Sequence, residues 1–229
     1  MSGGCEKKII YVGKSENLLS RLIDHLFAMD TLKKNIIEEV CKKAHENIYY
    51  YMNPYLCHKD VELVPIVDVK ELGPQLQGQK ILTVNNVVDY IEETISKHGL
   101  KKTKNFEDNL KKSKNGDLEA LERILINITQ PHLNKNKKGE TLKDLESHLK
   151  SYLCNYGLKI EELVNFLENL LEKEKLKSEK IKGCYIIKHS MLPGDVCKED
   201  IKQFIKNNSE LSKRVCKLYL EWKNRKKDC

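Results

Sequence analysis

The chain has 229 residues and a mass of 26.7 kDa, which is enough for one large or two small domains. Hydrophobic residues make up 40% and charged residues 33%, which permits a buried core and excludes a wholly disordered chain. The formal net charge of +7 favours an anionic partner such as nucleic acid, and the absence of a long apolar run excludes a membrane-spanning helix.

The first half of the chain predicts a mixture of strands and helices. Ser15 is expected as the N-cap of a helix over 15–29, and Gly99 is expected to end a helix over 85–98. Pro65 would place its strand at an edge or a bulge. In chain order we expect a strand over 7–13, helices over 15–29 and 32–52, a strand over 61–69 and a helix over 85–98.

The second half predicts mainly helices. Residues 101–115 are rich in Lys and Asn and are expected to form a loop or linker. After it we expect a helix over 117–128, a polar turn over 131–140, helices over 141–155, 160–180 and 198–223, and one strand over 183–188. The fold class is therefore α+β, with a small sheet and flanking helices followed by a mainly α-helical region over 140–229.

The eight cysteines are scattered and include no C-x-x-C pair, which argues against a zinc site. An even number of cysteines, with no apolar stretch of the secretory kind in residues 1–8, favours free thiols in a reducing compartment. We therefore expect an intracellular protein, in the cytoplasm or the nucleus, that is not secreted.

The most specific local feature lies over 8–18, where a strand ends in a glycine and a basic residue precedes the next helix. Tyr11 precedes Gly13, where the backbone can approach a ligand closely, and Lys14 follows at once. Arg21 and His25 lie four residues apart on one face of the next helix. A guanidinium grips a phosphodiester through two donors and stays protonated, so this unit suits the handling of phosphate.

This stretch resembles the GIY-YIG nuclease family, in which a YIG strand precedes a helix that carries N-L-x-x-R. The resemblance implies an endonuclease that hydrolyses DNA phosphodiester bonds with Mg²⁺ or Mn²⁺. It assigns Tyr11 to positioning or deprotonating the attacking water, and Arg21 and His25 to catalysis at the phosphate. Lys14 and Asn17 would bind the substrate.

The family supplies one glutamate in the pattern E-x-x-L-I-x-x-x-x-P-x-x-N. Glu122, Pro131 and Asn134 stand in that spacing. The resemblance makes Glu122 the metal ligand and a catalytic residue, with Asn134 near the substrate. A nuclease-like domain then covers 1–139 and contains an insert at about 40–110.

Two other interpretations of the carboxylate stay open. Glu92, followed by Gly99, Leu100 and Asn105, resembles an animal branch of the family and is the second choice as metal ligand. Glu122 is otherwise a solvated helix residue, and Pro131 an ordinary helix stop.

The first strand of the family, with its own G-[IV]-Y tyrosine, is not found ahead of Tyr11. Residues 183–187, Gly-Cys-Tyr-Ile-Ile, have the residue types of that strand, but their use would require a distant segment to pair with 8–12. A buried strand unrelated to catalysis is the favoured interpretation of this segment. A shortened N-terminus is a further explanation.

The main functional hypothesis is therefore a metal-dependent DNA endonuclease. The alternatives are a catalytically inactive nucleic-acid-binding protein and a helical protein-interaction protein. DNA is the expected partner, and the amphipathic C-terminal helices also suit a protein partner or a homodimer.

Overall fold

The computed structural model describes residues 7–31, 61–68, 81–134, 142–173 and 181–189, together with residues 210, 214, 217, 218, 220, 221 and 224. The helix expected over 32–52 lies outside these residues, as does most of the helix expected over 198–223. Contacts divide the chain into one unit of Met1–Leu18, Glu62–Leu158 and Lys180–Ser190, and a second unit of the remaining segments. The boundary expected at residue 139 falls within the first unit.

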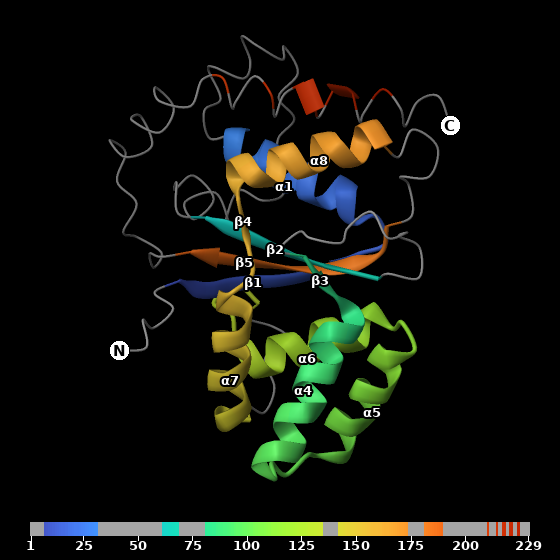
Figure 1. Cartoon of the computed structure of the whole chain (residues 1–229), viewed down its shortest axis with the longest axis vertical. Helices are drawn as coiled ribbons and strands as arrows, with labels where there is room; N and C mark the ends of the chain where they lie inside the picture. Colours follow the sequence, from blue (N-terminus) through green and yellow to red (C-terminus); the bar gives the residue numbers. More distant parts are fainter. Residues whose placement is uncertain are drawn as a thin grey trace. The chain divides into compact units, whose positions relative to one another are not determined.

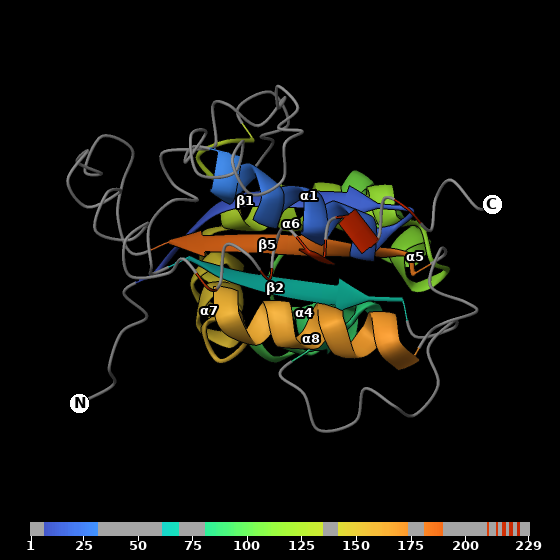
Figure 2. The ribbon, with the colours of Figure 1, turned by 90° about the horizontal axis from the view of Figure 1, so that it is seen from above.

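A sheet of five strands forms the centre of the first unit. The strand order is β1 (Lys8–Ser15), β5 (Gly183–His189), β2 (Glu62–Val67) and β3 (Leu82–Thr83), and β4 (Leu158–Lys159) pairs with β2 off this path. Figure 2 shows β5 between β1 and β2. The pairs β1–β5 and β5–β2 are antiparallel and β2–β3 is parallel. With its helices this sheet confirms the α+β class.

The pairing of β5 with β1 joins segments at opposite ends of the chain. Residue Gly13 lies opposite Tyr185, and Tyr11 lies opposite Ile187, with a register shift between Ile9 and Tyr11. The less favoured topology, in which residues 183–187 pair with the strand of Tyr11, is thus the one observed. The strand is not a minor interruption of a helical region, because all of its residues are buried.

Two local expectations are wrong in the first unit. Strand β2 lies between β5 and β3, so Pro65 is not on an edge strand; its ladder with β3 covers only Ile66 and Val67. Residues 104–114 form helix α5 (Lys104–Lys114) rather than a linker, because Phe106, Leu110 and Ser113 make a buried stripe at helical spacing. The many Lys and Asn residues of α5 make this short buried stripe hard to recognise in the sequence.

Four helices cover one face of the sheet in the first unit, as Figure 1 shows. They are α4 (Val84–His98), α5, α6 (Leu118–Thr129) and α7 (Lys143–Cys154). Thr83 caps α4 through a capping box with Asn86, and Gly99 ends it with a φ of 58°. Asp117 caps α6 by accepting from the amides of Glu119 and Ala120. The predicted ends of these two helices are confirmed.

The second unit contains most of α1 (Leu18–Thr31) and α8 (Ile160–Lys173). Ser15 is not the N-cap of α1, because it ends β1, and its hydroxyl closes a turn with the backbone of Asn17. In the second unit the Arg214 guanidinium binds Glu168 and donates to Asn165 Oδ1 at 2.7 Å. Within the described residues, none of the helices combines the length and apolar character that crossing a bilayer requires.

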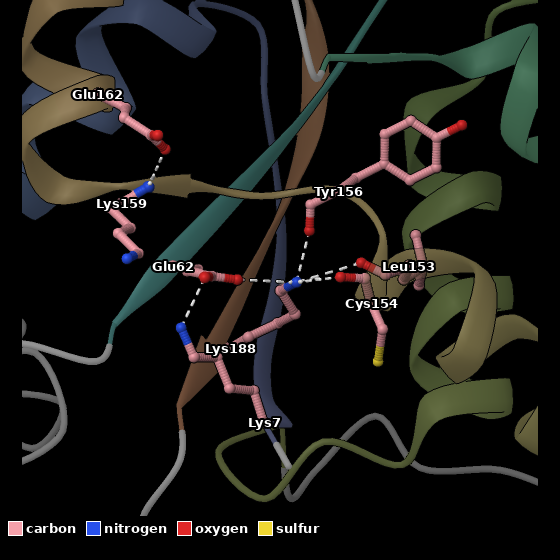
Figure 3. A network of polar contacts seen from close by, with 8 residues as sticks. All are labelled: Lys7, Glu62, Leu153, Cys154, Tyr156, Lys159, Glu162 and Lys188. Atoms are coloured by element: carbon pink, nitrogen blue, oxygen red, sulfur yellow. Dashed lines mark hydrogen bonds and ion pairs between the residues drawn. The ribbon is translucent and has the colours of Figure 1, made fainter. Parts of the chain in front are cut away.

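A buried lysine joins the sheet to the end of α7 (Figure 3). Lys188, only 1% exposed, pairs with Glu62 at 3.0 Å and donates to the carbonyl oxygens of Leu153 and Tyr156. Burial opposes the charge on Glu62, but the hydrogen bonds and charges of Lys188 and Lys7 outweigh it and lower the pKa of that carboxyl. Lys188 thus donates to carbonyl groups at the C-terminal end of α7, which lack partners within the helix.

The described cysteines differ in state. Cys184 is a buried free thiol. Cys154 is disulfide-bonded, so the expectation of free thiols is wrong for this residue.

Candidate functional site

Tyr11 and Tyr185 form an aromatic pair across β1 and β5. Their ring centroids are 5.9 Å apart at an interplanar angle of 38°. Gly13 makes this possible: a Cβ atom at residue 13 would lie 2.4 Å from Tyr185 Oη and 2.9 Å from Tyr11 Cε1. Tyr185 is fully buried and Tyr11 is half-buried, so Tyr11 is the member of the pair that presents surface to a ligand.

Asn134 ties the chain after α6 to the outer side of β1. Its Oδ1 accepts from the amide of Val12 at 2.9 Å, and its Nδ2 donates to the carbonyl oxygen of Val12 at 2.8 Å. The amide of Leu133 donates to the carbonyl oxygen of Ile10 at 2.9 Å. Backbone groups on the end strand of a sheet need such partners, and the Asn134 amide supplies both kinds.

Glu122 is a buried carboxylate on α6, the helix that lies against β1. It is 3% exposed, so the interpretation as a solvated helix residue is wrong. A buried carboxylate needs a compensating charge, and Glu122 interacts electrostatically with Lys14 of β1. The sequence pattern over 122–134 therefore brings both Glu122 and Asn134 to the strand that carries Tyr11.

Lys14 is also bound by a second carboxylate of α6. Its Nζ lies 3.1 Å from Glu119 Oε2, and Glu119 Oε1 lies 2.6 Å from Arg123 Nη2. The hydrogen bond from Lys14 lowers the pKa of Glu119, and Arg123 lowers it further. The same bond raises the pKa of Lys14, against a smaller opposing effect of burial; the charges of Glu119 and Glu122 also raise it.

Tyr11 and Lys14 lie on opposite faces of β1. Side chains alternate along a strand, and Tyr11 shares its face with Tyr185. Lys14 shares the other face with Cys184, whose Sγ lies 3.6 Å from the carbonyl oxygen of Leu118 in α6. In the described sheet β1 is the end strand, and Leu133 and Asn134 occupy its outer edge at Ile10 and Val12, so a ligand that touches both Tyr11 and Lys14 must pass around this covered edge.

Arg21 and His25 belong to the second unit, and their predicted convergence on Tyr11 stays a prediction. Arg21 is half-buried and His25 is fully buried. Burial, and the nearby charge of Arg21, lower the pKa of His25 to about 3. The imidazole is therefore neutral at physiological pH, and its role in catalysis also stays a prediction.

The remaining predicted residues have other contacts. Glu92 of α4 pairs with Lys114 of α5, and α6 rather than α4 is the helix in extensive contact with β1. Asn17, half-buried, accepts from Ser15 through its carbonyl and donates to it through its amide. Of the two candidate carboxylates, the structure thus places Glu122 on the helix beside the Tyr11 strand.

Sequence reasoning missed Glu119 and Arg123 and ranked Tyr185 low. The residue types of 183–187 were the available signal for Tyr185. The i, i+4 spacing of Glu119 and Arg123 was the available signal for their ion pair, whereas the ion pair between residues 14 and 119 depends on the tertiary fold.

One carboxylate is a sparse donor set for a metal ion. Among the described residues no three His, Cys, Asp or Glu side chains gather into one group. Mg²⁺ keeps several waters and commonly uses one or two carboxylates together with substrate phosphate. Glu122 would be the single protein ligand in this pattern, and its 3% exposure leaves little of the carboxylate accessible.

No protein-family model, no curated protein and no solved structure matches this chain.

Proposed function

We propose that the chain is a metal-dependent endonuclease acting on DNA phosphodiester bonds, similar to GIY-YIG nucleases. The observation that carries the proposal is the pairing of β5 with β1, which sets Tyr185 against Tyr11 over Gly13. This pairing supplies a second tyrosine strand, the part of the family pattern that the N-terminal sequence lacks. The attachment of Asn134 to Val12 supports the proposal independently.

In this proposal each residue has a defined task around the outer edge of β1. Tyr11 orients the attacking water or accepts its proton, and the buried Tyr185 ring fixes the position of Tyr11. Lys14 offsets the charge that builds on the phosphate. Glu122 would hold Mg²⁺ or Mn²⁺. When bound, such an ion neutralises charge on the attacked phosphate and on the leaving oxygen.

A supercoiled plasmid tests this proposal with the full chain. Wild-type protein should nick it with Mg²⁺ and should fail to do so with excess chelator. Tyr11→Phe should lower the nicking rate by about 10² to 10⁴. Tyr156→Phe is the matched control, because Tyr156 is a half-buried tyrosine of the first unit outside this site. Nicking that persists in chelator, or a Tyr11→Phe rate equal to wild type, contradicts the proposal.

A nucleic-acid-binding protein without hydrolytic activity is the second candidate. Two observations favour it: Tyr11 and Lys14 lie on opposite faces of β1, and Glu122 is only 3% exposed. This candidate predicts salt-dependent DNA binding by wild-type protein and no nicking with any divalent cation.

A further inference from the structure

We propose that Lys14 and Arg123 form a binding subsite for a backbone phosphate of DNA, which Glu119 occupies in the absence of DNA. The inference rests on the proposed function in one respect, since DNA is taken as the ligand. It adds to that function a second cation, Arg123, and a carboxylate that the phosphate displaces.

The geometry of the Glu119 carboxylate carries the inference. One of its oxygens lies 3.1 Å from Lys14 Nζ and the other 2.6 Å from Arg123 Nη2. A phosphodiester likewise offers two anionic oxygens, and both lysine and arginine bind them. The carboxylate therefore stands where a phosphate would bridge the same two cations.

The exposure of the three side chains permits this exchange. The Lys14, Glu119 and Arg123 side chains are 36%, 50% and 59% exposed. Ion pairs at such exposed positions contribute little to stability because water and salt screen them. Moving Glu119 away from Lys14 and Arg123 is consequently inexpensive, and both cations become available to an entering phosphate.

The proposed subsite lies beside Glu122. Lys14 interacts with Glu122 as well as with Glu119, so the subsite adjoins the carboxylate proposed to hold the metal ion. Glu119 and Arg123 are one helical turn apart on the exposed side of α6, whereas Glu122 lies on its buried side. DNA held by Lys14 and Arg123 would run along the outside of α6.

The test measures binding of a short labelled DNA duplex by fluorescence anisotropy, in chelator, over a range of salt concentrations. Glu119→Gln should bind about threefold to tenfold more tightly, because one negative charge near the phosphate is removed. Arg123→Ala should bind about threefold to tenfold more weakly and should reduce the slope of log K against log salt by about 0.9, the value for one lost phosphate contact.

Glu107→Gln is the matched control for the carboxylate. Glu107 lies in the first turn of α5 as Glu119 does in α6, and it pairs with a lysine, Lys102, at 3.9 Å. Lys102→Ala is the matched control for the cation. Each control changes the net charge by one unit as its partner variant does, and this general effect should change the affinity for the duplex by no more than about twofold. Circular dichroism melts confirm that every variant folds.

The outcomes separate this subsite from the nuclease. The subsite is overturned if Glu119→Gln and Arg123→Ala match their controls, or if wild-type protein does not bind the duplex. If binding shifts as expected and wild-type protein does not nick a plasmid with Mg²⁺, the subsite stands and the nuclease proposal fails. If Tyr11-dependent nicking occurs and binding does not shift, the nuclease stands and the subsite fails.

Discussion

Tyr185 lies opposite Gly13 in the ladder that joins β5 to β1, and its phenol fills the space that any larger residue at position 13 would need. Residues 172 positions apart in the sequence thus form one close contact, which fixes the register of the sheet beside Tyr11. The fold of the first unit and the candidate site depend on the same pair of strands.

Gly13→Ala should destabilise the protein by about 1–3 kcal/mol, because the new methyl group lies within contact distance of Tyr185 Oη and Tyr11 Cε1. Urea unfolding measures this change. In a Tyr185→Leu background the same Gly13→Ala change should cost much less, since the phenol that it meets is gone. An equal loss of unfolding free energy in the two backgrounds would show that residue 13 does not contact the Tyr185 phenol.

Asn134→Ala should destabilise the protein by about 2–3 kcal/mol, because the amide and carbonyl groups of Val12 lose their hydrogen bonds in a buried place. Hydrogen exchange gives a local measurement. The Val12 amide should lose protection, whereas the Leu133 amide, which donates to Ile10, should lose less. Unchanged protection at Val12 would show that Asn134 does not hold this strand.

Lys188→Met should lower the free energy of unfolding, measured in urea, by about 3 kcal/mol. The substitution leaves Glu62 paired with Lys7 alone and removes the hydrogen-bond donor from the carbonyl groups of Leu153 and Tyr156.

Lys182→Met is the matched control for Lys188→Met. Lys182 pairs with Glu16 at an exposed position, so its loss should change the free energy of unfolding by less than about 0.5 kcal/mol. Similar losses of unfolding free energy in the two variants would mean that the network of Figure 3 stabilises the protein no more than an exposed ion pair does.

Stability should fall as the pH is lowered through the range set by His25. The pKa of His25 is about 3 in the folded state and 6.5 ordinarily, so between these values the unfolded chain binds a proton that the folded chain does not. The stabilisation is complete above pH 6.5 and is lost toward pH 3. The loss attributable to His25 is about 1.4 kcal/mol per pH unit.

His25→Gln isolates this effect, because every other titrating group is common to both proteins. Urea unfolding from about pH 7 to about pH 5 should show the wild-type free energy of unfolding falling more steeply than that of the variant. Parallel pH profiles would show that His25 is not held neutral by burial.

Local sequence signals predicted the elements that have strong local determinants. A helix was predicted over 117–128, where α6 lies, and Gly99 predicted the end of α4. Helix α5 was missed because only a few apolar residues lie among many lysines and asparagines. In that helix tertiary burial of Phe106 and Leu110 outweighs composition.

The candidate site was predictable in part for the same physical reason. The spacing of Glu122 and Asn134 identified residues that a single helix and turn carry together. The pairing of β5 with β1, and the ion pair of Lys14 with Glu119, depend on segments far apart in the sequence. Local patterns hold no information on such pairs, and for this reason Tyr185 was ranked low and the ion pair of Lys14 with Glu119 was missed.

The most direct test of the account compares Glu122→Gln with Glu92→Gln in Mg²⁺-dependent plasmid nicking. Both variants remove one carboxylate from a helix of the first unit and keep its shape. Glu122→Gln should lower the nicking rate by at least about 10², whereas Glu92→Gln, which loses only an exposed pair with Lys114, should cut at the wild-type rate. Nicking by Glu122→Gln at the wild-type rate, or its loss in Glu92→Gln alone, would contradict the central claim.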